Sequence, residues 1–230
     1  MPRIRALLFD LDNTLVDFMK MKQAAVDAAI VSMIDAGLDV SSAEAKRRIW
    51  AIYDQEGIEF QEVFDRFLKD QYGAINYRIL AAGIIAYRQA REAAMVLYPH
   101  VKSTLVELVR RGYRLAVLSD APAKQAWLRL CSLGLHHFFE SVITFEDTGK
   151  RKPHPRPFQK ALAALGVTAA EALMIGDWPE RDMAGAKAVG IRTIYARYGD
   201  TFGVSHSGAD REIDDVSEIL ELLDDPKFNR

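Results

Sequence analysis

The sequence has little cysteine, and its histidines lack useful spacing. Cys131 is the single cysteine among 230 residues, which excludes an intramolecular disulfide and any cysteine-based zinc cluster. None of the five histidines is spaced as one of a pair of metal ligands. Cys131 itself lies in an apolar helical segment, which predicts a buried packing residue.

Long apolar runs and an excess of one charge are also missing. The longest apolar stretches, such as residues 80–87, are far shorter than the roughly 20 residues that span a bilayer, and acids appear at positions 10 and 12 before any signal-like stretch is complete. The 30 basic and 32 acidic residues give a net charge of −2, without the basic excess typical of nucleic-acid-binding proteins. We therefore expect a cytoplasmic protein of one or two domains, with no nucleic-acid or membrane partner.

What the sequence does contain is an apolar run, residues 6–9, at the end of an expected strand over residues 4–9, and Asp10 and Asp12 follow it at once. If the run is a buried strand, Asp10 lies at its carboxyl end, where ligands bind in open α/β sheets. One carboxylate can attack phosphorus while its neighbour exchanges a proton with the leaving group and then with water. Such crowded oxygen ligands favour Mg²⁺. An Asx turn with a helix N-cap explains this segment equally well when it is taken alone.

A second apolar run, residues 115–118, leads into Ser119 and Asp120. A hydroxyl followed by backbone N–H groups at the start of a helix is a natural phosphate cradle. The alternative is an ordinary cap on the helix that follows Pro122.

Two later segments repeat the pattern. After the strand-like residues 141–145, Lys152 is restricted by Pro153 and can neutralise phosphate oxygens and a carboxylate, although a solvated basic loop is the alternative. After residues 172–175 come Asp177 and Asp182, of which Asp177 can bind a metal directly while Asp182 orders the metal's surroundings or Lys152. A capped helix beginning near Pro179 does not explain this pair.

These four segments, in this order, resemble the four motifs of the haloacid dehalogenase-like (HAD) superfamily of phosphohydrolases. The motifs are Asp10-Leu11-Asp12-Asn13-Thr14, then Ser119, then Lys152 with Pro153, and finally Gly176-Asp177 with Asp182. The resemblance covers residues 1–200. Trp178 departs from the small or polar residue usual in the fourth motif, and either walls the pocket or packs.

The resemblance implies a catalytic role for three residues. Asp10 resembles the nucleophile that forms an aspartyl-phosphate, and Asp12 the general acid that protonates the leaving oxygen and later activates water. Lys152 would balance negative charge beside Asp10.

Binding roles are implied in the same way. The phosphoryl group would be bound by Ser119, the amides around it including Asp120, and Lys152. Thr14 belongs to the same phosphate-binding set and would also fix Asp10 by a hydrogen bond. Mg²⁺ would be held by the Asp10 carboxylate, the Asp12 carbonyl and Asp177, with Asp182 in support.

The segment between the first two motifs has helical periodicity and no convincing strand pattern. Alanines recur on one helix face between positions 24 and 29, and Ser41 or Ser42 is typical of a helix start. We expect an α/β core with a Rossmann-like parallel sheet, residues 1–17 and 99–230, and an inserted helical-bundle cap, residues 18–98. A last helix is predicted at 216–223, followed by a frayed tail at 224–230.

The leading hypothesis is a Mg²⁺-dependent phosphatase that cleaves a small phosphomonoester, namely a sugar phosphate, a phospho-acid or a nucleotide. Asp12 favours this activity, because dehalogenases of the superfamily lack an acid at that position. The alternatives are a phosphosugar mutase that uses the same Asp pair and a non-catalytic HAD-fold binding protein. The sequence predicts neither the particular substrate nor the oligomeric state.

Overall fold

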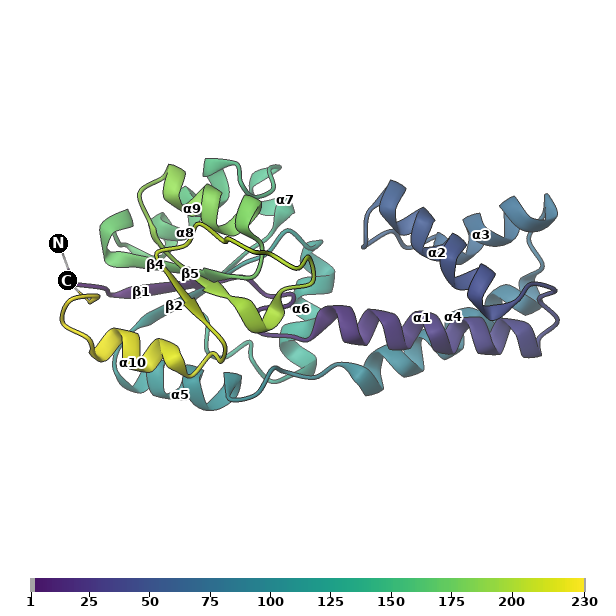
Figure 1. Cartoon of the computed structure of the whole chain (residues 1–230), viewed down its shortest axis with the longest axis horizontal. Coiled ribbons are helices and arrows are strands. Elements are labelled where there is room, and N and C mark those ends of the chain that lie inside the picture. The colour runs from purple at the N-terminus through teal and green to yellow at the C-terminus, as the bar shows by residue number, and fades with distance from the viewer. Residues whose placement is uncertain (1–2, 230) are drawn as a thin grey trace. The chain divides into compact units, whose positions relative to one another are not determined.

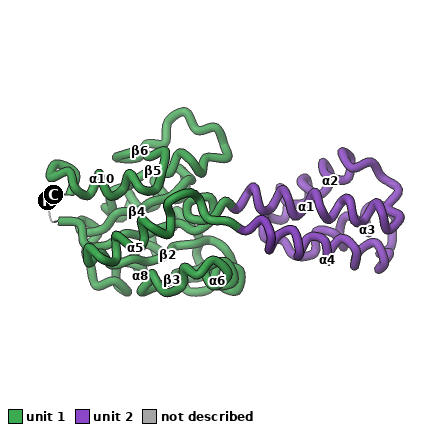
Figure 2. Tube along the Cα trace, turned by 90° about the horizontal axis from the view of Figure 1, so that it is seen from below, with its two compact units in different colours: residues 1–17, 96–230 green, residues 18–95 purple. Residues whose placement is uncertain are grey.

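The computed structural model describes residues 3–229, which form two compact units. One unit combines the segment up to Asp17 with the segment from Val96 onward, and the other is the continuous stretch Phe18–Met95 (Figure 2). The chain therefore leaves the first unit after its first strand and returns to it once. A hydrophobic core is present within each unit.

Among the described residues, six parallel strands form one sheet in the first unit, in the order β3-β2-β1-β4-β5-β6. The strands are β1 (Ala6–Phe9), β2 (Arg114–Leu118), β3 (Ser141–Ile143), β4 (Ala172–Gly176), β5 (Arg192–Ala196) and β6 (Arg211–Ile213). The central strands β1 and β4 are buried along their whole length. Burial on both faces explains why these strands are continuous apolar runs in the sequence rather than alternating ones.

Helices cover both faces of this sheet, with α8 and α9 on one side and α5 and α10 on the other (Figure 1). The helices of this unit are α5 (Val101–Arg110), α6 (Ala123–Ser132), α7 (Phe145–Thr148), α8 (Pro155–Leu165), α9 (Ala184–Ala188) and α10 (Glu218–Asp224). Helix α8 packs through Phe158, Ala161 and Leu165, which share one helix face because they are three and four residues apart. The predicted α/β fold with a Rossmann-like parallel sheet is confirmed.

The second unit contains four helices: α1 (Phe18–Asp35), α2 (Ser42–Glu56), α3 (Val63–Tyr72) and α4 (Tyr77–Ala94). Helices α1 and α4 lie side by side (Figure 2). Their close approach depends on Gly83 of α4, because a Cβ at this position would lie 2.7 Å from Cγ of Met33 on α1. Ser41 is the N-cap of α2, and its side chain accepts a hydrogen bond from the Glu44 N–H at 3.3 Å.

Two predicted strands are shorter in the structure. Strand β1 begins at Ala6 rather than at residue 4, and β3 ends at Ile143 rather than at residue 145. The early end of β3 has a local cause, because Thr144 and Asp147 form a reciprocal capping box that starts α7. The last helix likewise begins at Glu218, two residues after its predicted start.

The prediction of a buried Cys131 was wrong, because this cysteine is exposed. Helix α6 turns Arg129 into the interior, and a residue two positions further along a helix faces the opposite way.

The prediction of a frayed tail was also wrong for the residues that the structure describes. Phe228 is buried, and the Asn229 side chain accepts a hydrogen bond from the Ile4 N–H at 3.2 Å and donates one to the Leu223 carbonyl at 2.7 Å. The tail is therefore held by hydrogen bonds to residues of the first unit. Within the described chain, no helix is both long enough and apolar enough to span a bilayer.

Candidate active site

The predicted motif residues meet at the carboxyl edge of the sheet. Asp10, Ser119 and Asp177 each follow the last residue of a strand, β1, β2 and β4 respectively. These strands are neighbours and parallel, with β1 in the middle, so their ends lie together. The Asp10 N–H donates to the Ile175 carbonyl at 2.9 Å, which extends the β1–β4 pairing up to the aspartate itself.

The loop after β1 is held in a tight conformation. Asn13 has a positive φ of 60°, which asparagine tolerates better than most residues, and its N–H donates to the Val16 carbonyl at 2.7 Å. Gly199 packs directly against the Asn13 carbonyl, where a Cβ would collide. The Tyr198 hydroxyl donates to the Thr14 carbonyl at 2.8 Å. Contacts from beyond β5 therefore fix the loop that carries Asp12 and Thr14.

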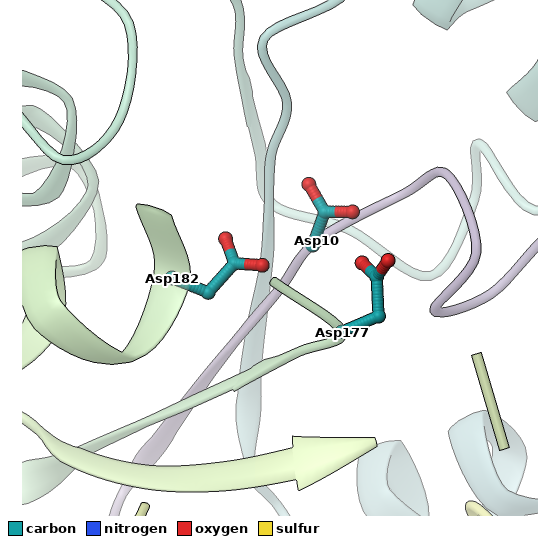
Figure 3. A group of neighbouring side chains, drawn as sticks. All are labelled: Asp10, Asp177 and Asp182. Atoms are coloured by element: carbon teal, nitrogen blue, oxygen red, sulfur yellow. The ribbon is translucent and has the colours of Figure 1, made fainter. Parts of the chain in front are cut away.

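Three buried carboxylates form the centre of the site. Asp10, Asp177 and Asp182 each offer an oxygen within 4.8 Å of the others, and Figure 3 shows these three carboxyl groups turned toward one another. Asp182 reaches the cluster from a helical turn at Pro179–Met183, and its Oδ2 accepts a hydrogen bond from the Trp178 N–H at 3.1 Å. Gly176 makes room for it, because a Cβ at Gly176 would collide with the Asp182 carboxyl group.

Lys152 lies within this acidic cluster. Its buried Nζ donates to Oδ1 of Asp10 and, at 2.6 Å, to Oδ1 of Asp182. The Lys152 backbone N–H donates to Oδ1 of Asp120 at 2.9 Å, and Asp120 also pairs with Arg181 at 3.2 Å. The Asp120 carboxylate therefore anchors the loop that carries Lys152.

The charges in this cluster do not balance. Burial raises the pKa of Asp10 and Asp182, against the opposing effect of the Lys152 charge, and burial together with the Asp182 charge raises the pKa of Asp177 to about 8. For Lys152, burial acts to lower the pKa, but the charges of Asp10 and Asp182 outweigh it and raise the pKa. Three ionised carboxylates and one ammonium would leave two negative charges in excess, which a divalent cation would neutralise.

The donor atoms fit such a cation. Carboxylate oxygens are the ligands that Mg²⁺ prefers, and Asp10 and Asp177 follow adjacent strands. Both oxygens of Asp182 already accept hydrogen bonds, from Lys152 and from the Trp178 N–H. Asp182 therefore suits an outer, supporting position better than direct ligation.

Two hydroxyl groups complete the centre. The Thr14 hydroxyl donates to Oδ1 of Asp177 at 3.3 Å. The acceptor is therefore Asp177 and not Asp10, as the sequence had predicted. The reason lies in the loop, which curls after Asp12 and brings Thr14 toward the end of β4. The Ser119 hydroxyl accepts a hydrogen bond from the Ala121 N–H at 3.1 Å.

Trp178, the residue that departs from the usual fourth motif, packs against two side chains of the first unit. The Arg181 guanidinium carbon lies 3.7 Å from the centroid of its ring, and the Phe202 ring centroid lies 4.5 Å away.

The sequence did not predict the contact between Arg129 and Asp12. The Arg129 guanidinium donates to Oδ2 of Asp12 at 2.8 Å. The available signal was its helical spacing, because Arg129 falls in phase with the buried Ala126 and Leu130 of α6.

Comparison with known proteins shows the family to which this chain is related. The sequence matches the haloacid dehalogenase-like hydrolase family over residues 4–190. It is 34% identical over 223 residues to the glyceraldehyde 3-phosphate phosphatase of Methanocaldococcus jannaschii, covering 96% of this chain and 97% of that protein. It is 31% identical over 235 residues to the phosphoglycolate phosphatase of Pectobacterium atrosepticum, with 96% and 92% covered.

A solved structure gives the same result. The crystal structure of a HAD phosphatase from Thermococcus onnurineus aligns with a TM-score of 0.71 at 26% identity, covering 96% of this chain and 98% of that one. Because the family match extends over most of the sequence and the named phosphatases align along nearly all of it, the chain belongs to the haloacid dehalogenase-like hydrolases, in their phosphatase branch.

Proposed function

We propose that this chain is a Mg²⁺-dependent phosphatase that cleaves a small phosphomonoester through an aspartyl-phosphate on Asp10. The observation that carries the proposal is the position of the Asp10 carboxylate. It is buried at the end of the central strand, contacts Lys152 and lies beside Asp177. A carboxylate in this setting is a nucleophile whose charge the site can offset when a phosphate dianion approaches.

In the first step an Asp10 oxygen attacks phosphorus, and the bond from phosphorus to the leaving oxygen breaks. Asp12, two residues further on, gives its proton to that oxygen, so the product leaves as an alcohol. Lys152 neutralises charge on Asp10 and on the phosphoryl oxygens. The Ser119 hydroxyl accepts its hydrogen bond from Ala121, which leaves its own proton for a phosphoryl oxygen.

In the second step water attacks the phosphorus of the aspartyl-phosphate. Asp12, now ionised, accepts a proton from this water, and the bond between phosphorus and the Asp10 oxygen breaks. Inorganic phosphate and the free carboxylate are released. Asp12 thus returns to its protonated state, and the cycle closes without any further reactant.

Mg²⁺ would be held by the carboxylates of Asp10 and Asp177 and by the main-chain carbonyl of Asp12. When bound, it supplies positive charge that lowers the repulsion between the nucleophile and the phosphate. Thr14 orients Asp177 through the 3.3 Å hydrogen bond between their side chains. Asp182 orients Lys152 from the other side.

Two relatives support a substrate class. They are named for glyceraldehyde 3-phosphate and phosphoglycolate, which are both short phosphorylated carbon chains. We therefore propose a phosphorylated small aldehyde, sugar or acid as the substrate of this chain.

The test is phosphate release by the full chain from a panel of small phosphomonoesters, with Mg²⁺ and with a chelator. We expect release that depends on Mg²⁺ and is abolished in Asp10→Asn, a nearly isosteric change that removes the nucleophilic charge. A circular dichroism spectrum shared with the wild type would show that the variant is folded. Release by Asp10→Asn at the wild-type rate would contradict the proposal, and formation of a phosphosugar isomer without net phosphate release would favour a mutase.

A further inference from the structure

Helix α6 has an unusual distribution of apolar and charged residues. It exposes Trp127 by 44% and Leu128 by 43%, yet it buries Arg129, which is 5% exposed. Arginine is almost never fully buried unless it is paired. Because this helix buries an arginine while it exposes a tryptophan and a leucine, we expect a specific partner for the buried Arg129.

The partner is the residue to which the proposed mechanism assigns both proton transfers. Arg129 donates from a terminal guanidinium nitrogen to Oδ2 of Asp12 at 2.8 Å, with the two side chains 6% and 22% exposed. Arg129 belongs to the helix after the second motif and Asp12 to the loop after the first strand. Hydrogen bonds from a charged donor are shorter and stronger than neutral ones, so the guanidinium can hold Oδ2 of Asp12 whether the carboxyl group is protonated or ionised.

We propose that Arg129 is a positioning residue for Asp12, so that loss of the guanidinium impairs both proton transfers while the site remains assembled. This inference rests on the proposed function. Asp12 must reach the leaving oxygen in one step and the attacking water in the next. A bond from the buried Arg129 to one oxygen restricts the carboxylate and directs its other oxygen to this work.

The choice of arginine fits this role better than lysine would. The guanidinium stays charged throughout, so it never exchanges a proton with Asp12 and cannot divert the one that the reaction moves. It is also planar and rigid, so its donor approaches Oδ2 of Asp12 from a defined direction. Lysine keeps the charge but presents a point donor on a flexible stem.

The experiment measures kcat and KM for Arg129→Gln and Arg129→Lys with an alkyl phosphate and with p-nitrophenyl phosphate. Misplacement of a catalytic group costs about 10- to 100-fold in rate, so we expect a fall of this size in kcat for the alkyl substrate, with KM nearly unchanged. Arg129→Lys should recover part of the loss.

Nitrophenolate leaves without a proton, so phosphoryl transfer to Asp10 should be affected less with p-nitrophenyl phosphate. Hydrolysis of the aspartyl-phosphate still needs Asp12, so a burst of nitrophenolate should appear in Arg129→Gln.

The decisive control is a double-mutant cycle with Asp12→Asn. If Arg129 acts through Asp12, then Arg129→Gln should cause almost no further loss in the Asp12→Asn background, because interacting residues are not additive. The same fold-loss in both backgrounds would overturn the proposal. A rise in KM alone would also overturn it, because it would assign Arg129 to substrate binding instead.

A matched control addresses folding. Arg114→Gln breaks another arginine–carboxylate pair, with Glu140, at the opposite end of β2, and should leave kcat unchanged. If Arg129→Gln does not fold, Arg129→Lys and its cycle with Asp12→Asn decide the question. An inactive wild type would defeat the proposed function, whereas an active wild type with unaffected Arg129 variants would defeat this inference alone.

Discussion

At the scale of the residue, Lys152 joins two carboxylates with different roles. It contacts Asp10, the proposed nucleophile, and it also binds Asp182, which carries no chemistry of its own in the proposed mechanism. Asp182 is held in turn by the Trp178 N–H. Because one oxygen of Asp182 is bound to Lys152, Asp182 influences the position and charge of that lysine beside Asp10.

Replacing Asp182 by asparagine tests this reading. The amide removes the charge that pairs with Lys152 and loses one acceptor, so Lys152 is placed less firmly beside Asp10. We expect kcat to fall by about 10- to 100-fold, as for other groups that support a reacting residue, with the folded structure retained. Steady-state kinetics check this, with Glu180→Gln in the same turn as a control, since Glu180 is exposed. Equal kinetics for the two variants would refute the role of Asp182.

The site was predictable from the sequence where its residues follow strands. Asp10, Ser119 and Asp177 come directly after apolar runs, and parallel neighbours bring such positions together. The hydrogen-bond partners were not predictable in this way. Thr14 bonds to Asp177 and Arg129 to Asp12 across 163 and 117 residues, and only the folded chain determines which groups meet.

At the scale of the element, the close contact between α1 and α4 depends on a single missing side chain. Gly83 lies in the interior of α4, where alanine is ordinarily about 1 kcal/mol more favourable. Here the added Cβ would lie 2.7 Å from Cγ and 2.9 Å from Sδ of Met33. Neither atom is the free end of that side chain, so relief requires movement of the whole methionine or of the helix.

We therefore expect Gly83→Ala to lower the stability of the protein, because overpacking a filled core costs about 1–3 kcal/mol. Thermal melts followed by circular dichroism measure the effect. The double variant Met33→Ala/Gly83→Ala tests the cause, because with Met33 shortened the alanine at position 83 should be tolerated better than in the single variant. A Gly83→Ala protein that melts above the wild type would contradict this packing.

The predicted elements differ from the observed ones where a tertiary contact overrides the local pattern. Continuous apolar runs gave β1, β2 and β4 to within two residues at their starts, because burial on both faces requires such runs. Cys131 was assigned to the wrong face of α6, because the buried face of that helix is the one that carries Ala126, Arg129 and Leu130. The tail is ordered through Asn229, whose partners include Ile4 at the other end of the chain.

At the scale of the whole molecule, we expect the acidic centre to affect stability as well as the proposed catalysis. The pKa of Asp177 is about 8 in the folded protein, raised by burial and by Asp182 from an ordinary value of 3.8. At pH values between 3.8 and about 8, Asp177 therefore keeps its proton in the folded state but not in the unfolded chain. Without metal, stability should fall as pH rises through this window.

The proposed Mg²⁺ would bind the ionised carboxylates and reverse this loss, so we expect its stabilising effect to grow from about pH 5 to about pH 8. At a hundredfold excess over its Kd the gain is about 3 kcal/mol, or several degrees in Tm for a chain of this size. Melts with Mg²⁺ and with a chelator across this range measure it. Asp177→Asn should lose most of the gain, and a gain that shrinks with rising pH would contradict the assignment.

The proposed mechanism requires the phosphoryl group to pass through Asp10. The most direct measurement is an acid quench of the full chain during turnover of p-nitrophenyl phosphate with Mg²⁺, followed by peptide mapping by mass spectrometry. We expect a phosphoryl group on the Asp10 side chain, removable by hydroxylamine and absent from Asp10→Asn. A phosphoryl group on another residue, or rapid phosphate release with no phosphorylated peptide even in Asp12→Asn, where the intermediate should accumulate, would contradict this mechanism.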